Sequence, residues 1–163
     1  MSTKVETRKE GIISGLIEAR GCILRAASSL STEKQDEVFL GVWSVKDLLA
    51  HLVGWDYTNI EAAREILDGK LPSFYAHYDR DWKSYNAGLV ERYRKENFAE
   101  LLSSVEDSHR ELIEFLRTVP AEEFDRDRGL RAGRYKVTIA RLLQVEINDE
   151  KKHCVQIRVW GEE

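Results

Sequence analysis

The chain has 163 residues, of which 42% are hydrophobic and 33% are charged, and its 25 basic and 29 acidic residues give a formal net charge of −4. This length and composition predict one compact domain over residues 1–163, built around one apolar core. Neither sign of charge forms a long block, which argues against broad electrostatic binding, so no nucleic-acid partner is expected.

Apolar residues recur at helical spacing through four long segments, whereas alternating, strand-like runs are nearly absent. This periodicity predicts an all-α protein. The first helix is expected from about Val5 to Leu30, where a Ser-Leu-Ser-Thr cluster follows. Ser44, with Asp47 three residues later, has the pattern of a helix N-cap and predicts a second helix that runs to about Leu67.

Residues 72–97 form the least regular part of the sequence and are rich in aromatic rings and polar tips. We predict a cross-over segment here, containing a short helix from about Asp81 to Arg94. The segment links the second and third long helices.

Two further caps mark the remaining helices. Asn97 repeats the capping pattern and opens a third long helix that runs to Val119, and Thr138 caps a fourth helix that continues nearly to Trp160. The Asp- and Arg-rich stretch ending at Gly133 is predicted to be a loop. Four long helices with one long cross-over between the second and the third describe a four-helix bundle.

No 18-residue apolar run occurs, and the first ten residues lack the apolar centre of a signal peptide. We therefore expect a cytoplasmic protein with no membrane partner. Cys22 and Cys154 share no short metal-type spacing, and two cysteines give no disulfide framework. Both are predicted to be free thiols that fill small spaces in the core, with a reactive thiol as the alternative.

Ionisable residues occur on the predicted core face of the fourth helix. Glu146, Asp149 and His153 lie with Leu142, Ile157 and Trp160 within roughly 80° of arc, so a helix that buries the apolar residues turns the others inward too. Inside a bundle, such groups need a metal ion, a mutual ion pair or a water-filled pocket.

The spacing of these residues suggests how a metal ion would be held. Asp149 and His153 are four residues apart, one turn above each other, and His51 in the second helix is a candidate third ligand. Glu146 is roughly 10 Å from His153 along the axis and fits a supporting role better. Explanations without a metal ion stay open. An acidic residue and a histidine four residues apart are common on solvent-exposed helix surfaces. His51 lies at the flank of the apolar stripe of its helix, where a hydrogen-bonded boundary histidine is the ordinary expectation.

Three stretches of the sequence resemble the DinB/YfiT-like superfamily. The run Trp-Ser-Val-Lys-Asp-Leu-Leu-Ala-His-Leu-Val-Gly-Trp at positions 43–55 resembles its second-helix signature, in which the histidine, here His51, is a metal ligand. Residues 149–160 resemble its fourth-helix motif of two histidines four apart followed by x-x-Gln-Ile, but Asp149 stands where the first histidine is usual. Residues 81–86 with 91–94 further resemble the ClbS/DfsB-like branch.

The resemblance implies a bundle that holds a divalent transition metal, with nickel or zinc favoured, on His51, Asp149 and His153. It implies a metal-dependent enzyme that transfers a low-molecular-weight thiol, or metal-activated water, to a small electrophile. In that reaction Glu146 is the predicted catalytic residue, which orients a ligand or takes a proton. The carboxylate of Asp149 is a sound ligand, but its presence is equally compatible with loss of the metal.

Two alternatives to the metalloenzyme stay open. One is a metal-free protective protein of the ClbS/DfsB type, which binds or hydrolyses a reactive electrophile with acidic and tyrosyl side chains. The other is a non-enzymatic, stress-related helical bundle that forms a homodimer. The residues predicted to contact a substrate are Trp55, Asp56, Tyr57, Trp82 and Tyr85, with Tyr78 also at the mouth, although packing of the cross-over segment explains the aromatic residues equally well.

Overall fold

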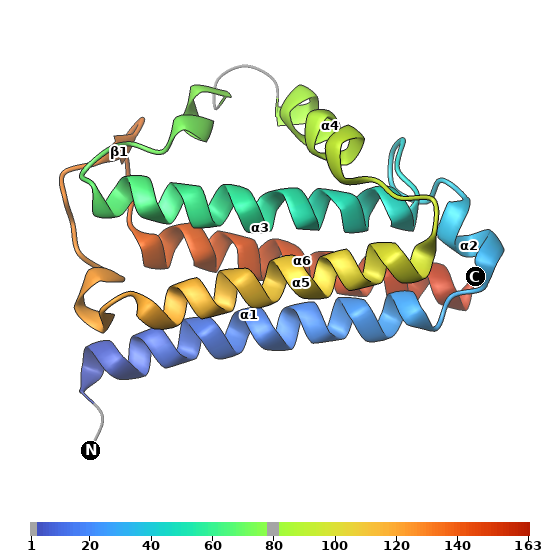
Figure 1. Cartoon of the computed structure of the whole chain (residues 1–163), viewed down its shortest axis with the longest axis horizontal. Helices are drawn as coiled ribbons and strands as arrows, with labels where there is room; N and C mark the ends of the chain where they lie inside the picture. The colour runs from blue at the N-terminus through green and yellow to red at the C-terminus, as the bar shows by residue number, and fades with distance from the viewer. Residues whose placement is uncertain (1–2, 78–81) are drawn as a thin grey trace.

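The structure is a computed structural model that describes residues 3–77 and 82–163, and four long helices dominate it (Figure 1). This confirms the predicted all-α class and the long cross-over between the second and third long helices. Tyr78 and the expected start of the short helix at Asp81 lie outside the described residues. In chain order the elements are α1 (Lys4–Ser28), α2 (Thr32–Asp36), α3 (Val45–Leu67), the 3-10 helix η1 (Ser73–His77), α4 (Trp82–Tyr93), α5 (Phe98–Thr118), the 3-10 helix η2 (Ala121–Glu123), β1 (Arg131–Ala132), β2 (Tyr135–Lys136) and α6 (Ile139–Glu162).

Side-chain caps set where the long helices begin. The Ser44 hydroxyl accepts a hydrogen bond from the Asp47 backbone N–H at 3.2 Å, and the Asp47 carboxylate accepts one from the Ser44 N–H at 2.9 Å. This capping box satisfies two backbone donors that the first turn of α3 leaves free. Asn97 and Thr138 cap α5 and α6 in the same way with their side-chain oxygens, as the sequence predicts.

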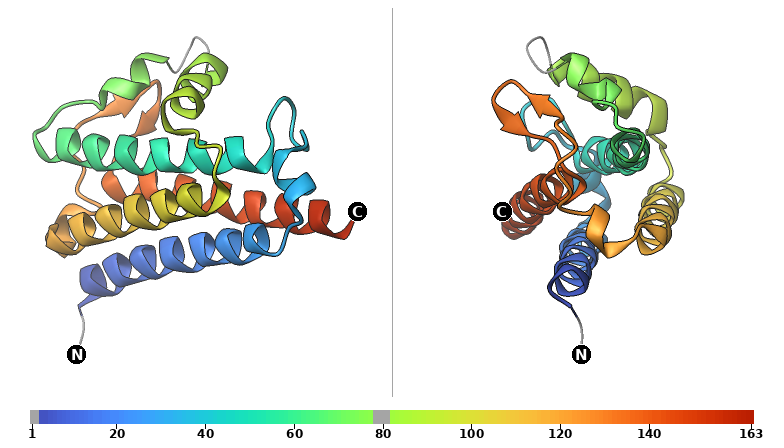
Figure 2. Two further views of the ribbon diagram at one scale, coloured as in Figure 1. Left: turned by 45° about the vertical axis from the view of Figure 1, so that its right-hand side comes forward. Right: turned by 90° about the vertical axis from the view of Figure 1, so that its left-hand side faces the viewer.

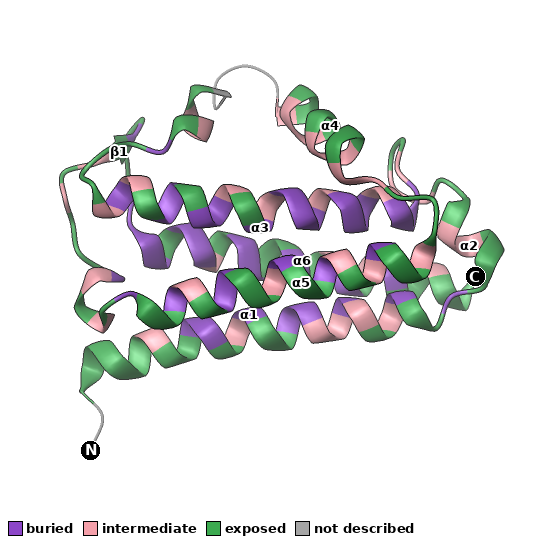
Figure 3. Cartoon of the chain, in the orientation of Figure 1, coloured by how far each residue is buried: buried purple, intermediate pink, exposed green. Residues whose placement is uncertain are grey.

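The four long helices pack as two pairs. Helix α1 packs mainly against α6, and α3 packs mainly against α5, while α4 lies outside the bundle on α3. An end-on view shows the four long helices surrounding the core, with α4 and the hairpin on the α3 side (Figure 2, right). Buried residues follow the inward faces of the helices (Figure 3). None of the described helices combines the length and apolarity that a membrane-spanning helix needs.

A layer of charged side chains crosses the interior of the bundle. The Arg20 guanidinium of α1 donates two hydrogen bonds of 2.8 Å to the Asp56 carboxylate of α3, and its Nε donates to Glu150 of α6 at 2.6 Å. Ser108 of α5 donates to Asp56 at 2.5 Å. All four residues are at most 1% exposed. Because both carboxylates are paired, the layer joins all four long helices without leaving an isolated buried charge.

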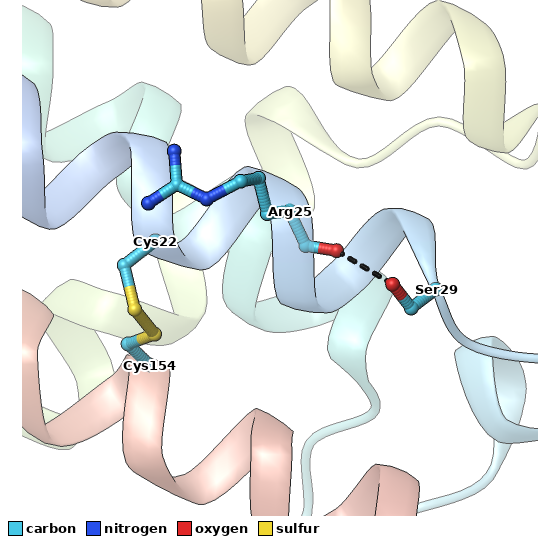
Figure 4. Close-up of a disulfide and its surroundings, with 4 residues drawn as sticks. All are labelled: Cys22, Arg25, Ser29 and Cys154. Atoms are coloured by element: carbon cyan, nitrogen blue, oxygen red, sulfur yellow. Dashed lines mark hydrogen bonds between the residues drawn. A yellow bond between two sulfur atoms is a disulfide. The ribbon is translucent and has the colours of Figure 1, made fainter.

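The prediction of two free thiols is wrong, because Cys22 of α1 and Cys154 of α6 form a disulfide with a Cα–Cα distance of 5.9 Å. Figure 4 shows the bond between the two helices, one turn before the hydrogen bond from the Ser29 hydroxyl to the Arg25 carbonyl. The cysteines are 132 residues apart in sequence. No local spacing rule reveals that pairing, which results from α1 lying beside α6.

The predicted loop before α6 contains a short antiparallel hairpin, β1–β2, in which Ala132 pairs with Tyr135. Its turn includes Gly133 at φ 60, a backbone conformation that glycine adopts at little cost. Two-residue strands are too short to produce an alternating pattern, so periodicity could not predict this hairpin. The hairpin matters because Tyr135 and Lys136 help to form the cavity described next.

Candidate functional site

A cavity of about 660 Å³ lies where α3, α6, the cross-over segment and the hairpin meet. This volume is in the range of pockets that bind small molecules. Its walls carry aromatic rings together with imidazole, amide and carboxyl groups. The lining residues are Trp43, His51, Leu52, Trp55, Asn59, Phe74, Tyr75, Trp82, Asn86, Ala132, Tyr135, Lys136, Val137, Arg141, Leu142, Val145, Glu146, Asp149 and His153.

The cavity brings together most of the side chains that the sequence singled out. The predicted metal ligands, the predicted catalytic residue and two of the predicted substrate contacts all line it: His51, Asp149, His153, Glu146, Trp55 and Trp82. Three other predicted substrate contacts lie elsewhere. Asp56 is fully buried in the ion pair with Arg20, and Tyr57 and Tyr85 line a separate cavity between α3 and α4.

Tyr57 illustrates the different surroundings of that second cavity. Its hydroxyl donates a 2.5 Å hydrogen bond to Glu111, and its ring stacks on Tyr93 with centroids 5.8 Å apart. The hydrogen bond to Glu111, followed by burial, raises the pKa of Tyr57 to about 12. A phenol held in this way is a poor source of a phenolate nucleophile near neutral pH.

His51 lies at the inner part of the main cavity and is neutral near pH 7. Burial, followed by the nearby His153, lowers its pKa from 6.5 to about 3. The two imidazole rings are nearly perpendicular, with centroids 6.0 Å apart, and the His51 ring also lies 4.8 Å from that of Trp43. The His51 Nδ1 atom is buried and has no hydrogen-bond partner within the described part of the chain. By contrast, His153 Nδ1 is 2.8 Å from the side-chain oxygen of Gln156.

The predicted metal ligands do not converge on one point in the described part of the chain. Within residues 3–77 and 82–163, no group of three or more histidine, cysteine, aspartate or glutamate side chains is placed to hold one. Asp149 is exposed at the rim, and one nitrogen of His153 is engaged by Gln156. The arrangement therefore does not fit a three-ligand centre, and the metal set His51, Asp149 and His153 stays a prediction.

Glu146 is a buried carboxyl group at the wall of the cavity, 8% exposed. Burial, followed by repulsion from Glu150, raises its pKa well above the ordinary value. This shift favours the neutral carboxylic acid, because burial disfavours the charged form and a second negative charge next to Glu150 is unfavourable. A carboxylic acid kept neutral in this way can donate a hydrogen bond or a proton to a bound molecule.

Aromatic rings from α3 and the cross-over segment form one wall of the cavity. The rings of Trp55, Phe74 and Trp82 have centroids 5.5 to 5.9 Å from one another, in edge-on and tilted arrangements. The Trp55 indole N–H donates to Asn86 of α4 at 2.8 Å, which fixes the ring against the cross-over segment. These contacts explain how the cross-over segment packs, and they also give the cavity a rigid apolar wall.

Sequence reasoning missed two residues of this region. Arg20 is the cation of the buried layer. Helical periodicity places this position of α1 on the inward face but does not predict which residues Arg20 pairs with. Asn59 lines the cavity and is 1% exposed. A signal for Asn59 was present, because it follows His51 and Trp55 at intervals of four residues on the same helix.

Comparison with known proteins identifies the family. A family model described as the DinB superfamily matches residues 16–157. The chain belongs to the DinB superfamily. No curated protein matches this DinB-superfamily chain. Among solved structures, it is similar to the colibactin self-resistance protein ClbS in complex with double-stranded DNA, with a TM-score of 0.74, 17% sequence identity and 93% of each chain covered.

The ClbS complex overturns the prediction that nucleic acid is excluded as a partner. A protein with this fold has been solved bound to double-stranded DNA. The prediction relied on a formal net charge of −4 and on the absence of long charged blocks. Net charge does not report where individual cations lie on the folded surface, so it cannot exclude a local binding face.

Proposed function

We propose that this DinB-superfamily protein is a protective protein that binds a small reactive electrophile in the 660 Å³ cavity and hydrolyses it. The observation that carries the proposal is the buried, neutral carboxyl group of Glu146 beside an aromatic wall. The similarity in fold to a self-resistance protein supports the same function. An aromatic wall binds the apolar body of the electrophile, and the acid acts at its reactive end.

The proposed reaction needs only water and the carboxyl groups of Glu146 and Glu150. For an electrophile with a strained heteroatom ring, the oxygen of a water molecule attacks a ring carbon while the bond from that carbon to the heteroatom breaks. The heteroatom takes the proton of Glu146, and the attacking water gives its surplus proton back to the carboxylate pair of Glu146 and Glu150. The net change is addition of one water molecule, and the protein returns to its starting protonation state.

Styrene oxide is a suitable probe because it joins an aromatic ring to a strained epoxide. Formation of the diol is measured by chromatography for the wild type and for Glu146→Gln, which keeps the size of the side chain but removes the acid. We expect the rate of diol formation, relative to the uncatalysed reaction in buffer, to be roughly 10²- to 10⁴-fold lower for the variant than for the wild type. Glu162→Gln, at an exposed position on the same helix, is the matched control and is expected to retain it. A Glu146→Gln rate equal to that of the wild type would overturn the proposal.

Metal analysis separates this proposal from metal-dependent thiol transfer. The partnerless Nδ1 of His51, close to His153, is the observation that favours the metalloenzyme. Stoichiometric nickel or zinc in the purified protein, lost in both His51→Ala and His153→Ala, would support it. Hydrolysis that is unchanged by a chelator supports the metal-free reaction instead.

A second candidate function is DNA binding, favoured by the ClbS complex and by basic side chains near the mouth of the cavity. Arg134 and Arg141 both lie over the Tyr135 ring, at 5.8 and 5.2 Å. In the described part of the chain, neither has a carboxylate within ion-pair distance. Such cations are available to phosphate groups.

Fluorescence anisotropy with a labelled DNA duplex tests this second function. We expect binding to weaken as salt increases, and the double variant Arg134→Ala/Arg141→Ala to reduce the slope of log K against log salt by up to about 2. Arg110→Ala, which removes an exposed arginine of α5, is the control. Equal slopes for the double variant and the wild type would exclude this face.

A further inference from the structure

The α3 wall of the cavity has a regular order of chemical groups. His51, Trp55 and Asn59 follow one another at intervals of four residues, so their side chains form one row along the helix, and all three line the cavity. Eight residues correspond to about 12 Å of helix rise. The row therefore presents a polar group, an aromatic ring and a second polar group over this length.

Both polar ends of the row have unsatisfied hydrogen-bonding atoms. The Nδ2 atom of Asn59 and the Nδ1 atom of His51 are buried and have no partner among the described residues. A buried amide N–H without an acceptor costs free energy, and native proteins rarely leave one unsatisfied. Asn59 is 1% exposed, so a molecule that enters the cavity is the natural source of the missing acceptor.

The cross-over segment next to the α3 row restricts the shape of that molecule. Phe74 and Trp82 of the cross-over segment pack on Trp55 in edge-on and tilted arrangements, and all three rings line the cavity. Flat, unsaturated molecules bury more surface against such rings than branched aliphatic ones do.

We propose that the ligand of this cavity is an elongated, planar aromatic molecule that lies along α3, with a hydrogen-bond acceptor such as a carbonyl oxygen at the Asn59 end. This inference rests on the proposed function, because it names the ligand class of the same cavity. The ring system contacts Trp55, the acceptor receives the Asn59 N–H, and the far end of the molecule reaches His51. Glu146 faces the same space from α6.

Two dyes of nearly identical shape test the acceptor. Nile red is a long, planar molecule with a carbonyl oxygen at one end, and Nile blue carries a protonated imine, a hydrogen-bond donor, at the same place. Each is titrated with the wild-type protein, and binding is followed by dye fluorescence. We expect Nile red to bind more tightly than Nile blue. Absence of Nile red binding, or a preference for Nile blue, overturns the proposal without requiring any variant to fold.

Two variants test where the acceptor and the ring bind. Asn59→Leu is expected to weaken Nile red by about 2- to 12-fold, and so to reduce the preference for Nile red over Nile blue. Trp55→Leu is expected to weaken both dyes by a similar factor. Asn148→Leu, at an exposed position of α6, is the control and is expected to match the wild type. An unchanged dye preference in Asn59→Leu overturns the assignment of the acceptor.

The dye-binding and hydrolysis experiments together distinguish a wrong ligand class from a wrong proposed function. If the dyes show no Asn59-dependent preference but styrene oxide hydrolysis still depends on Glu146, the ligand class is wrong and the function stands. If the dye preference holds while hydrolysis does not depend on Glu146, the cavity is a binding site of the inferred class and the proposed reaction is wrong.

Discussion

His109 of α5 provides a sharp test of the electrostatics of the bundle interior. Both of its ring nitrogens are buried and lack a partner within residues 3–77 and 82–163. Burial, followed by the nearby charge of Arg20, lowers the pKa of His109 from 6.5 to about 4. The folded protein therefore resists protonation of this ring, while the unfolded chain does not.

The shift makes the stability of the protein depend on pH in a defined direction. Because the folded-state pKa is depressed, the unfolded chain takes up the proton first as the pH falls. The stability that neutral His109 contributes is present above pH 6.5 and is lost as the pH falls towards 4. Between pH 7.5 and pH 5 this loss amounts to about 2 kcal/mol in the free energy of unfolding.

Two substitutions isolate this contribution. His109→Gln and His109→Leu both remove the titrating group, so each variant should lose about 2 kcal/mol less stability than the wild type over that pH range. His109→Leu also removes two unsatisfied ring nitrogens, and it should be more stable than the wild type at pH 7.5 by about 1–3 kcal/mol. His109→Gln keeps a polar group at the same place and should not show that gain.

Urea unfolding followed by tryptophan fluorescence measures both quantities. Unfolding curves at pH 7.5, 6 and 5 give the free energy for each variant, and differences from the wild type cancel the effects of other titrating groups such as Glu146. If both variants show the same pH dependence as the wild type, His109 is not buried as a neutral ring. If His109→Leu is destabilised at pH 7.5, its nitrogens have partners in solution.

Other predictions concern the helix contacts. Arg20→Met should destabilise the fold by about 3–5 kcal/mol in urea unfolding, because it leaves two buried carboxylates unpaired; a loss under 1 kcal/mol would contradict this. Reduction of Cys22–Cys154 should lower stability by about 2–4 kcal/mol, with no effect of reductant on Cys22→Ser. Gly54→Ala should lower the free energy of unfolding by about 1–3 kcal/mol, because the added Cβ would lie 2.7 Å from a side chain of α4. Gly88→Ala is the control: it has open space around it and should leave the stability unchanged or increase it. Equal melting temperatures for the two glycine variants would argue against close α3–α4 packing.

The parts of the fold that local sequence determines were predictable. Each of Ser44, Asn97 and Thr138 caps its helix through a hydrogen bond to a backbone N–H three residues later, and such contacts need no knowledge of the rest of the chain. Helical periodicity likewise predicted the four long helices and the cross-over, because apolar residues at three- and four-residue intervals mark the buried face.

Features that join distant segments were not predictable in the same way. The interior position of Asp56 depends on Arg20 reaching it from another helix, and the disulfide depends on which helices are neighbours. For the candidate site, periodicity correctly directed Glu146 towards the interior. The same periodicity also directed Asp149 inward, and there it was wrong: Asp149 is exposed at the rim of the cavity, because neighbouring segments decide whether a residue at the edge of a helical stripe faces the core or the solvent.

The pairing of α1 with α6 has a consequence for biosynthesis. Arg20 and Cys22 are translated long before Glu150 and Cys154, so during synthesis the guanidinium has only Asp56 as a partner and the thiol has none. The same late helix supplies Glu146 and one wall of the cavity. A chain that still lacks α6 therefore has neither its full set of interior contacts nor a complete binding site, because both depend on the same C-terminal helix.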